Sequence, residues 1–274
     1  MRSTFINIAR SPIKKYKTSE HYFKKLHAHY FKNHPIANGL AQADENLKLL
    51  IENGLVILPN YHSVEQINSV RDQIYPYVNA VKTGNKLGIK EQDIVKYEED
   101  GIYRVRGIQN YVNDALPFFN DEYLLDIAHK YTYHPIRSTT GYADYKPDIG
   151  VHDGTTTMHM DQWKASIKIF TLLTDIGVSN APMVYWKKSH KPQPWRFRID
   201  FMNSTGLDQG SGFCPAQLVK NFEKITITGE AGTVIVADTR GIHRASNLLE
   251  DHRLQLVQKF TSDFYPHFSS VIKS

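Results

Sequence analysis

Apolar positions in the first half of the chain recur mainly with the period of a helix. Residues 19–33, 42–53 and 120–131 each place hydrophobic side chains three or four positions apart, which predicts three amphipathic helices. The apolar run Leu55–Leu58 is too short for a helix and ends at Pro59, so it predicts a short buried strand. The first half is therefore expected to mix helices with strand.

A further helix is expected after residue 62, because Ser63-Val64-Glu65-Gln66 has the pattern of a capping box. In this motif the Ser63 hydroxyl accepts from the backbone amide of Gln66, and the Gln66 side chain reaches back to the amide of Ser63. The helix is continued by apolar residues at helical spacing, namely Ile67, Val70, Ile74 and Val78.

After about residue 135 the pattern changes to that of strands. Segments rich in β-branched and aromatic residues alternate with Gly, Pro, Asn and Asp. These segments are Ile136–Tyr145, Ser166–Thr174, Pro182–Trp186, Ile225–Thr228, Thr233–Ala237 and Leu254–Thr261. Several short strands behind a partly helical front half predict a mainly β fold, a sandwich or barrel with flanking helices.

The composition is that of a globular protein, with 41% hydrophobic residues among 274 and a net charge of +5. No apolar run approaches the roughly 18 residues that span a bilayer, and the first ten residues lack the apolar core of a secretory signal. Cys214 is the only cysteine, which excludes an intrachain disulfide and predicts a small buried hydrophobe. We therefore expect a cytoplasmic protein with no membrane partner.

Much of the positive charge lies near the N-terminus, on Lys14, Lys15, Lys17, Lys24, Lys25 and Lys32. A basic arm of this kind can bind nucleic acid, which would give salt-sensitive binding to DNA or RNA. The aromatic residues between these lysines follow helical spacing, however, and that favours a solvated amphipathic helix. We therefore expect no nucleic-acid partner.

The chemically informative feature is His159-Met160-Asp161, at the head of a predicted strand. In extended backbone, residues i and i+2 project to the same face, so the imidazole and the carboxylate reach one point in space. His243, which follows the strand Thr233–Ala237, is a candidate third ligand. Two histidines and one carboxylate on one face of a metal leave the opposite positions open, as in non-haem Fe(II) oxygenases.

A His-x-Asp triplet is common by chance, so the evidence for a metal site comes from the residues that accompany it. Arg253 lies ten residues beyond His243 and opens another apolar strand. Its guanidinium can bind a carboxylate through two parallel hydrogen bonds, which suits the distal carboxylate of a dicarboxylic co-substrate. His190 is expected to lie in a loop after a strand rather than to bind metal.

The segment 136–262 carries these features as an ordered series of blocks: His159–Trp163, Leu172–Asp175, Met183–Lys191, Gly229–Asp238, His243 and Arg253, with a front element at Glu52–Pro59. In this order the blocks resemble the phytanoyl-CoA dioxygenase family of Fe(II)/2-oxoglutarate oxygenases. The resemblance implies a double-stranded β-helix (jelly-roll or cupin-like) core over residues 136–262. It implies one oxygenase domain over 1–274, in which 1–135 is a helical and mixed support region and 263–274 a C-terminal tail.

The same resemblance implies the site. Iron would be held by His159, Asp161 and His243, and the C5 carboxylate of 2-oxoglutarate by Arg253. Tyr142 and Thr171 are further candidates for contact with 2-oxoglutarate, because the resemblance places their strands around the pocket.

The implied reaction is hydroxylation of a C–H bond of a small organic molecule by O2, with 2-oxoglutarate converted to succinate and CO2. Related halogenating sites lack the carboxylate, so Asp161 favours hydroxylation. Arg106, Arg240 and Arg244 are candidates for binding an anionic group of the substrate, although surface salt bridges are the commoner role. The alternative is a catalytically silent β-barrel that binds a metal or a small molecule. The sequence does not determine the substrate or the oligomeric state.

Overall fold

The computed structural model describes residues 44–97, 101–132, 136–138, 141–149, 157–161, 166–191, 193, 195, 214 and 216–262. The helix expected over 19–33 and the lysines of the N-terminal segment lie outside these residues. So does the side chain of Trp163, at the end of the His159–Trp163 block.

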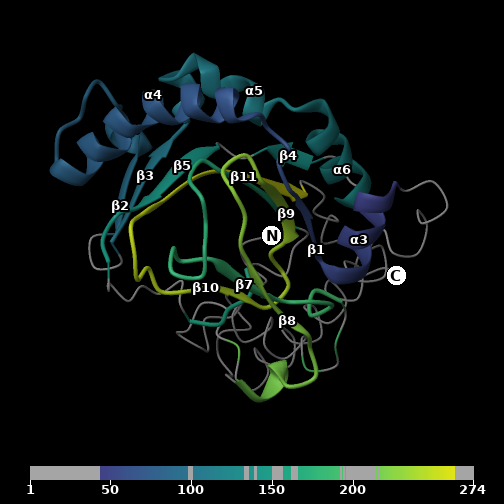
Figure 1. Cartoon of the computed structure of the whole chain (residues 1–274). Helices are drawn as coiled ribbons and strands as arrows, with labels where there is room; N and C mark the ends of the chain where they lie inside the picture. Colours follow the sequence, from purple (N-terminus) through teal and green to yellow (C-terminus); the bar gives the residue numbers. More distant parts are fainter. Residues whose placement is uncertain are drawn as a thin grey trace, which may run out of the picture.

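A large antiparallel sheet forms the centre of the described structure (Figure 1). Its strands are β1 (Leu55–Leu58), β2 (Ile94–Tyr97), β3 (Ile102–Arg106), β4 (Ile136–Ser138), β5 (Tyr142–Lys146), β6 (Ser166–Leu172), β9 (Val234–Asp238) and β11 (Arg253–Ser262). They pair in the order β1-β9-β6-β11-β5-β3-β2, with β4 beside β11. The front half of the chain thus contributes β1, β2 and β3 to the same sheet as the second half.

A smaller antiparallel sheet lies opposite one face of the large one (Figure 1). Its order is β10 (His243–Ala245), β7 (Met183–Trp186) and β8 (Lys224–Ile227). Apolar side chains of the two sheets pack together between them, including Leu172 and Ile235 of the large sheet and Tyr185 and Ile227 of the small one. Two packed sheets of short antiparallel strands confirm the mainly β architecture predicted from the sequence.

The helices cover the other face of the large sheet (Figure 1). They are α3 (Glu45–Asn53), α4 (Val64–Thr83), α5 (Leu116–Phe119) and α6 (Glu122–Thr132), with short 3-10 turns at Glu91–Asp93, Ile108–Asn110 and Asn113–Ala115. A further 3-10 turn, Ala216–Val219, precedes β8 on the side of the small sheet. The predicted capping box is present, because the Ser63 hydroxyl accepts from Gln66 N and the Gln66 side chain accepts from Ser63 N. Among the described residues, no helix is long and apolar enough to cross a membrane.

Strand alternation divides the large sheet into an outer and an inner face. Outward side chains pack under the helices in two apolar clusters, for example Val105 under α4 and Ile169 under α3 and α6. Inward side chains change character across the sheet. Arg104 of β3 lies opposite Asp144 of β5, which lies opposite Gln255 of β11. Towards β1 the inward residues become apolar, so a charged half and an apolar half share one interior.

Candidate metal centre

His159 and His243 are held together by their own backbones. They form an isolated antiparallel bridge in which each backbone N–H donates to the other residue's carbonyl oxygen, both at 2.9 Å. The two imidazole ring centroids are 4.3 Å apart. His243 begins β10, so the small sheet fixes its position. The two backbone hydrogen bonds of the bridge then fix His159 beside it.

Asp161 completes a group of three ligand atoms. Its Oδ1 is 4.0 Å from Nε2 of His159 and 3.9 Å from Nε2 of His243. One ligand atom from each residue fits within 4.8 Å of the others, which is close enough for all three to bind one metal ion. The i, i+2 spacing of His159 and Asp161 therefore brings their side chains to one point, as the sequence predicts.

Both imidazoles are oriented by hydrogen bonds from their other ring nitrogen. Nδ1 of His159 donates to the carbonyl of Thr157 at 2.8 Å, and Nδ1 of His243 donates to the carbonyl of Gly241 at 2.8 Å. Because a carbonyl can only accept, these bonds place the proton on Nδ1 and leave Nε2 with a free lone pair. Burial, together with nearby His159, lowers the pKa of His243 to about 4, so its imidazole is neutral near pH 7 and can bind metal.

The turn Asp238–Gly241 supports two of the three ligands. The carbonyl of Thr239 accepts from Asp161 N at 2.8 Å, and the carbonyl of Gly241 accepts from His243 as described above. Gly241 has no room for a side chain, because a Cβ there would lie 1.9 Å from the Tyr185 hydroxyl. The backbone of this turn is therefore part of the site.

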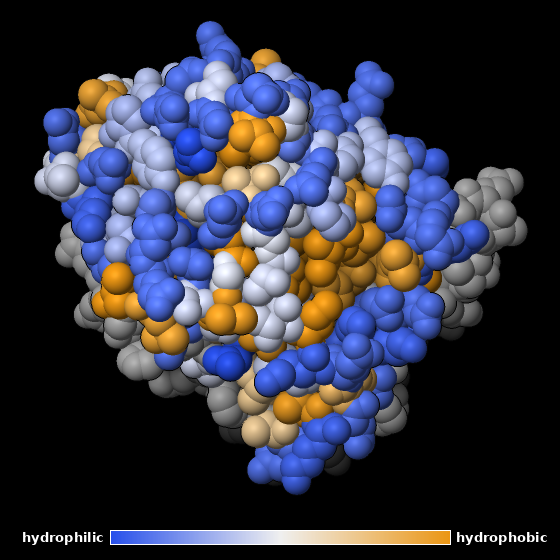
Figure 2. Space-filling view, in the orientation of Figure 1, coloured by the Kyte–Doolittle hydropathy of each residue, from blue (hydrophilic) through white to orange (hydrophobic). Residues whose placement is uncertain are grey.

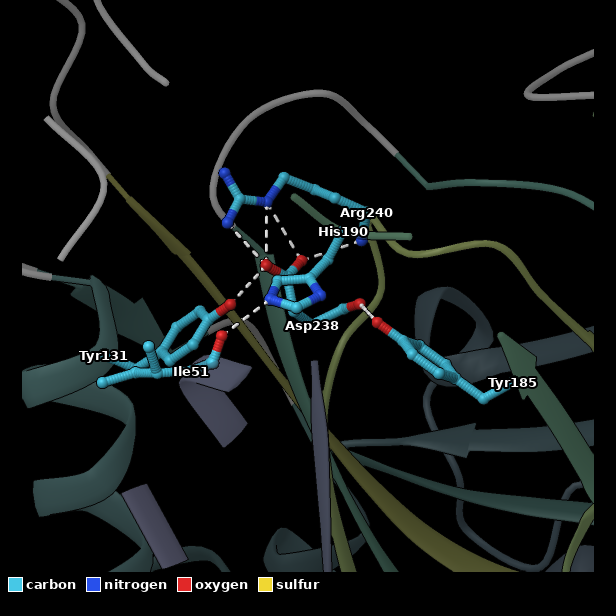
Figure 3. A network of polar contacts seen from close by, with 6 residues as sticks. All are labelled: Ile51, Tyr131, Tyr185, His190, Asp238 and Arg240. Carbon is cyan, nitrogen blue, oxygen red and sulfur yellow. Dashed lines mark hydrogen bonds and ion pairs between the residues drawn. The ribbon is translucent and has the colours of Figure 1, made fainter. Parts of the chain in front are cut away.

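A buried polar network holds the turn in place (Figure 3). Both carboxylate oxygens of Asp238 lie 3.0 Å from Nε of Arg240, and Oδ2 also accepts from the Tyr131 hydroxyl of α6 at 2.7 Å. The Tyr185 hydroxyl donates to the Asp238 carbonyl at 2.9 Å, while His190 donates to the carbonyl of Ile51. Asp238 and Arg240 are fully buried, so the expectation of a surface salt bridge for Arg240 is wrong. His190 lies in the turn after β7, as predicted, and it is buried.

The Asp161 carboxylate is also bound by a lysine of the inner sheet face. Nζ of Lys168, on β6, lies 2.6 Å from Oδ2 of Asp161, and each side chain is 18% exposed. Burial alone would raise the pKa of Asp161, but the Lys168 ammonium and His243 hold that pKa well below its usual range. The carboxylate is therefore ionised and available as a ligand.

Arg253 lies on the same inner face, and two of its three guanidinium nitrogens already have hydrogen-bond partners. Its Nη1 donates to the carbonyl of Ala181 at 2.7 Å, and its Nη2 lies 3.1 Å from Oδ2 of Asp144. Asp144 also binds Nε of Arg104 and the amide of Gln255. Burial alone would raise the pKa of Asp144, but the two guanidinium groups lower it to about 2. Nε of Arg253 is buried and has no acceptor among the described residues.

A cavity connects these groups between the two sheets. Its polar lining includes both candidate metal-binding histidines, Lys168, Tyr142, Arg104 and Arg253. Its apolar lining includes Phe170, Leu172, Ile176, Met183, Ile227 and Ile235. Figure 2 shows hydrophobic residues gathered in a hollow between β1 and β8. The interior can therefore take a molecule with one charged and one apolar part.

The two further candidates for contact with 2-oxoglutarate differ in position. Tyr142 of β5 lines the cavity, as the sequence suggested. Thr171 does not, because its neighbours Phe170 and Leu172 point into the cavity and alternation turns Thr171 to the outer face. Arg244 also lines the cavity, whereas Arg106 lies exposed at the end of β3.

Sequence reasoning missed three charged residues of this interior: Arg104, Asp144 and Lys168. Each lies inside a predicted or actual strand, and a charged residue within a strand of apolar neighbours is the signal that could have identified it.

The fold is that of the jelly-roll enzymes that use iron and 2-oxoglutarate. No protein-family model and no curated protein sequence matches the chain. Solved structures match it over most of its length, at 13–16% sequence identity in the examples compared, and at this level the likeness establishes the fold.

Three of these structures illustrate the range. EctD from S. alaskensis, solved with bound Fe, is 15% identical with a TM-score of 0.61, over 82% of this chain and 78% of that one. The α-ketoglutarate-dependent epimerase SnoN from nogalamycin biosynthesis is 14% identical with a TM-score of 0.58, over 79% of each chain. HygX from Streptomyces hygroscopicus, solved with nickel, 2-oxoglutarate and hygromycin B, is 14% identical with a TM-score of 0.53, over 81% and 88%.

Proposed function

We propose that this chain is a non-haem Fe(II)/2-oxoglutarate-dependent dioxygenase that hydroxylates a C–H bond of a small organic molecule. The observation that carries the proposal is the meeting of His159, Asp161 and His243 at one point of a jelly-roll interior, with Arg253 lining the same cavity. In this reaction O2 is consumed and 2-oxoglutarate becomes succinate and CO2.

The donor set fits iron. Two imidazoles and one carboxylate are the ligands of the 2-His-1-carboxylate facial site, which leaves positions open for co-substrate and O2. The Nδ1 hydrogen bonds of both histidines give the second layer of support usual for metal-binding imidazoles. Bound iron would supply the redox chemistry that activates O2.

The remaining residues bind and orient the co-substrate. Arg253 has a buried Nε that lacks an acceptor among the described residues, and a carboxylate of 2-oxoglutarate would satisfy it. Tyr142 borders the same space and would contact the co-substrate. The apolar half of the cavity limits access of water to the reacting groups.

The test is turnover of 2-oxoglutarate by the full chain, loaded with Fe(II) in the presence of ascorbate. We expect succinate even without the substrate, at a low rate, and no succinate from the His159→Ala variant. Incubation with a small-molecule extract under ¹⁸O2 should produce a metabolite that carries one ¹⁸O atom. Metal binding without any succinate would support the alternative of a binding module. Absence of metal binding would contradict the oxygenase and would leave only a module that binds a small molecule.

We also propose that the substrate carries an anionic group. Arg104 and Arg253 line the cavity and share one carboxylate, Asp144, and the C5 carboxylate of 2-oxoglutarate would take up the excess positive charge of this group of three. Arg244 is a further cation of the lining, outside this group, and is the residue proposed to bind the anionic group of the substrate. If the extract is divided by anion exchange, the fraction that stimulates succinate formation should be the retained one. Stimulation confined to the unretained fraction would contradict an anionic substrate.

A further inference from the structure

We infer that Lys168 is a positioning residue: it binds one carboxylate oxygen of Asp161, so that Asp161 can bind the metal only through its other oxygen. The inference rests on the proposed function and goes beyond it, because neither the ligand pattern nor the co-substrate arginine assigns a role to this lysine.

The two carboxylate oxygens of Asp161 have different partners. Oδ1 faces Nε2 of both His159 and His243, at 4.0 and 3.9 Å. Oδ2 forms an ion pair with Nζ of Lys168 at 2.6 Å. Only Oδ1 is therefore directed towards the point where the imidazoles converge.

The backbone fixes the carboxylate and the lysine independently. Asp161 N donates to the carbonyl of Thr239 at 2.8 Å. Lys168 lies inside β6, which pairs with β9 on one side and β11 on the other. A lysine held in the middle of a sheet can keep its ammonium group at one place, as a flexible surface lysine cannot.

Lys168 occupies an electrostatically unfavourable position. Lys259 lies directly opposite it on β11, and like charges directly opposite each other destabilise a sheet. The positive charge of Arg104 also acts on Lys168 unfavourably. Asp161 is the carboxylate that compensates this charge among the described residues. A residue that costs stability in the fold is expected at a functional position.

The consequence concerns the number of open metal positions. Three protein ligands would leave three positions open on a six-coordinate ion, enough for two oxygens of 2-oxoglutarate and for O2. If Asp161 bound through both oxygens it would take a position that 2-oxoglutarate requires. Lys168 prevents this by holding Oδ2.

The experiment compares the full-length chain with Lys168→Met, which has a similar length and no charge. Co(II) and 2-oxoglutarate binding are measured by calorimetry, and coordination is followed by the Co(II) absorption spectrum. We expect Lys168→Met to bind Co(II) as tightly as the unmodified chain, to show an altered Co(II) spectrum, and to bind 2-oxoglutarate at least about tenfold more weakly, a size typical for loss of a residue that orients a metal ligand. Lys168→Arg should retain most of the 2-oxoglutarate affinity.

Lys259→Met is the matched control, because Lys259 lies opposite Lys168 and is not among the residues that line the cavity. It should leave the Co(II) spectrum and the 2-oxoglutarate affinity unchanged. Unchanged binding and spectrum in Lys168→Met would overturn the inference, and so would loss of Co(II) binding in a variant with unaltered circular dichroism. Failure of the unmodified chain to bind Co(II) would instead contradict the proposed function, so the two failures are distinguishable.

Discussion

Arg253 and Asp144 form an ion pair inside the cavity, with Nη2 3.1 Å from Oδ2, so the arginine proposed for 2-oxoglutarate already holds a carboxylate of its own chain. Asp144 orients the guanidinium, and Arg104 offsets the negative charge that Asp144 would otherwise present to an incoming dicarboxylate. The arginine is thus positioned before the co-substrate arrives, which lowers the cost of ordering on binding.

Replacement of Arg253 by lysine should therefore raise the KM for 2-oxoglutarate. The guanidinium contacts Ala181 O and Asp144 and still presents Nε, whereas an ammonium cannot supply this geometry. We expect an increase of at least about tenfold, about 1.4 kcal/mol of binding. Steady-state succinate formation measures the KM, and calorimetry should show unchanged metal affinity. Arg71→Lys, at a part-exposed arginine on α4, is the control. An unchanged KM for Arg253→Lys would remove Arg253 from the co-substrate site.

Asp144→Asn should destabilise the fold in a pH-dependent way. Arg104 and Arg253 lower the pKa of Asp144 in the folded chain from 3.8 to about 2. The ionised group therefore stabilises the fold fully above pH 4, and this contribution is lost as the pH falls towards 2. We expect a loss of about 2 kcal/mol at pH 7, from the size of the pKa shift. Urea unfolding at several pH values measures it, and an equal loss at pH 7 and pH 2 would contradict the ion-pair explanation.

Metal binding should stabilise the chain through its three ligands. A metal at 100 times its Kd adds about 2.7 kcal/mol to the free energy of unfolding. Mn(II) should therefore raise the Tm, EDTA should reverse the increase, and His243→Ala should abolish it. His62→Ala, at a partly buried histidine outside the centre, should retain the increase. A shift of equal size in His243→Ala would place the metal elsewhere.

Gly241→Ala should weaken metal binding without changing any ligand. The added Cβ would lie 1.9 Å from the Tyr185 hydroxyl, and relief of this contact must move the turn that orients His243. We expect a loss of about 2 kcal/mol in stability, typical of overpacking, together with weaker Mn(II) binding. Gly177→Ala is the matched control, because its Cβ meets only the Asn180 side-chain oxygen at 3.1 Å. Normal Mn(II) affinity in Gly241→Ala would show that the turn does not control the site.

Two of the three candidate ligands, His159 and Asp161, could be predicted because their geometry depends on short spacing. The period of two in extended backbone brings His159 and Asp161 to one side whatever the rest of the fold does. Thr171 could not be placed in the same way. Both faces of β6 are covered, by helices on one side and by the small sheet on the other, so the sequence does not distinguish inner from outer positions.

The burial of the charged residues could not be predicted from the sequence for a related reason. Arg240 was expected in a surface salt bridge, but it pairs with Asp238, to which Tyr131 of α6 donates, and both charged residues are completely buried. Strands β2 and β3 are four and five residues long, and β3 is held in the sheet by its pairing with β5. Such features depend on partners distant in sequence.

The position of β11 has a consequence for biosynthesis. This strand, Arg253–Ser262, lies between β5 and β6 in the middle of the large sheet, although it is the last described strand along the chain. A polypeptide emerging from the ribosome therefore exposes the facing edges of β5 and β6 until residue 262 has left the exit tunnel. Open edges of this kind favour aggregation, and pairing between distant segments is slow. The nascent chain should depend on chaperones for longer than a protein whose central strands are made first.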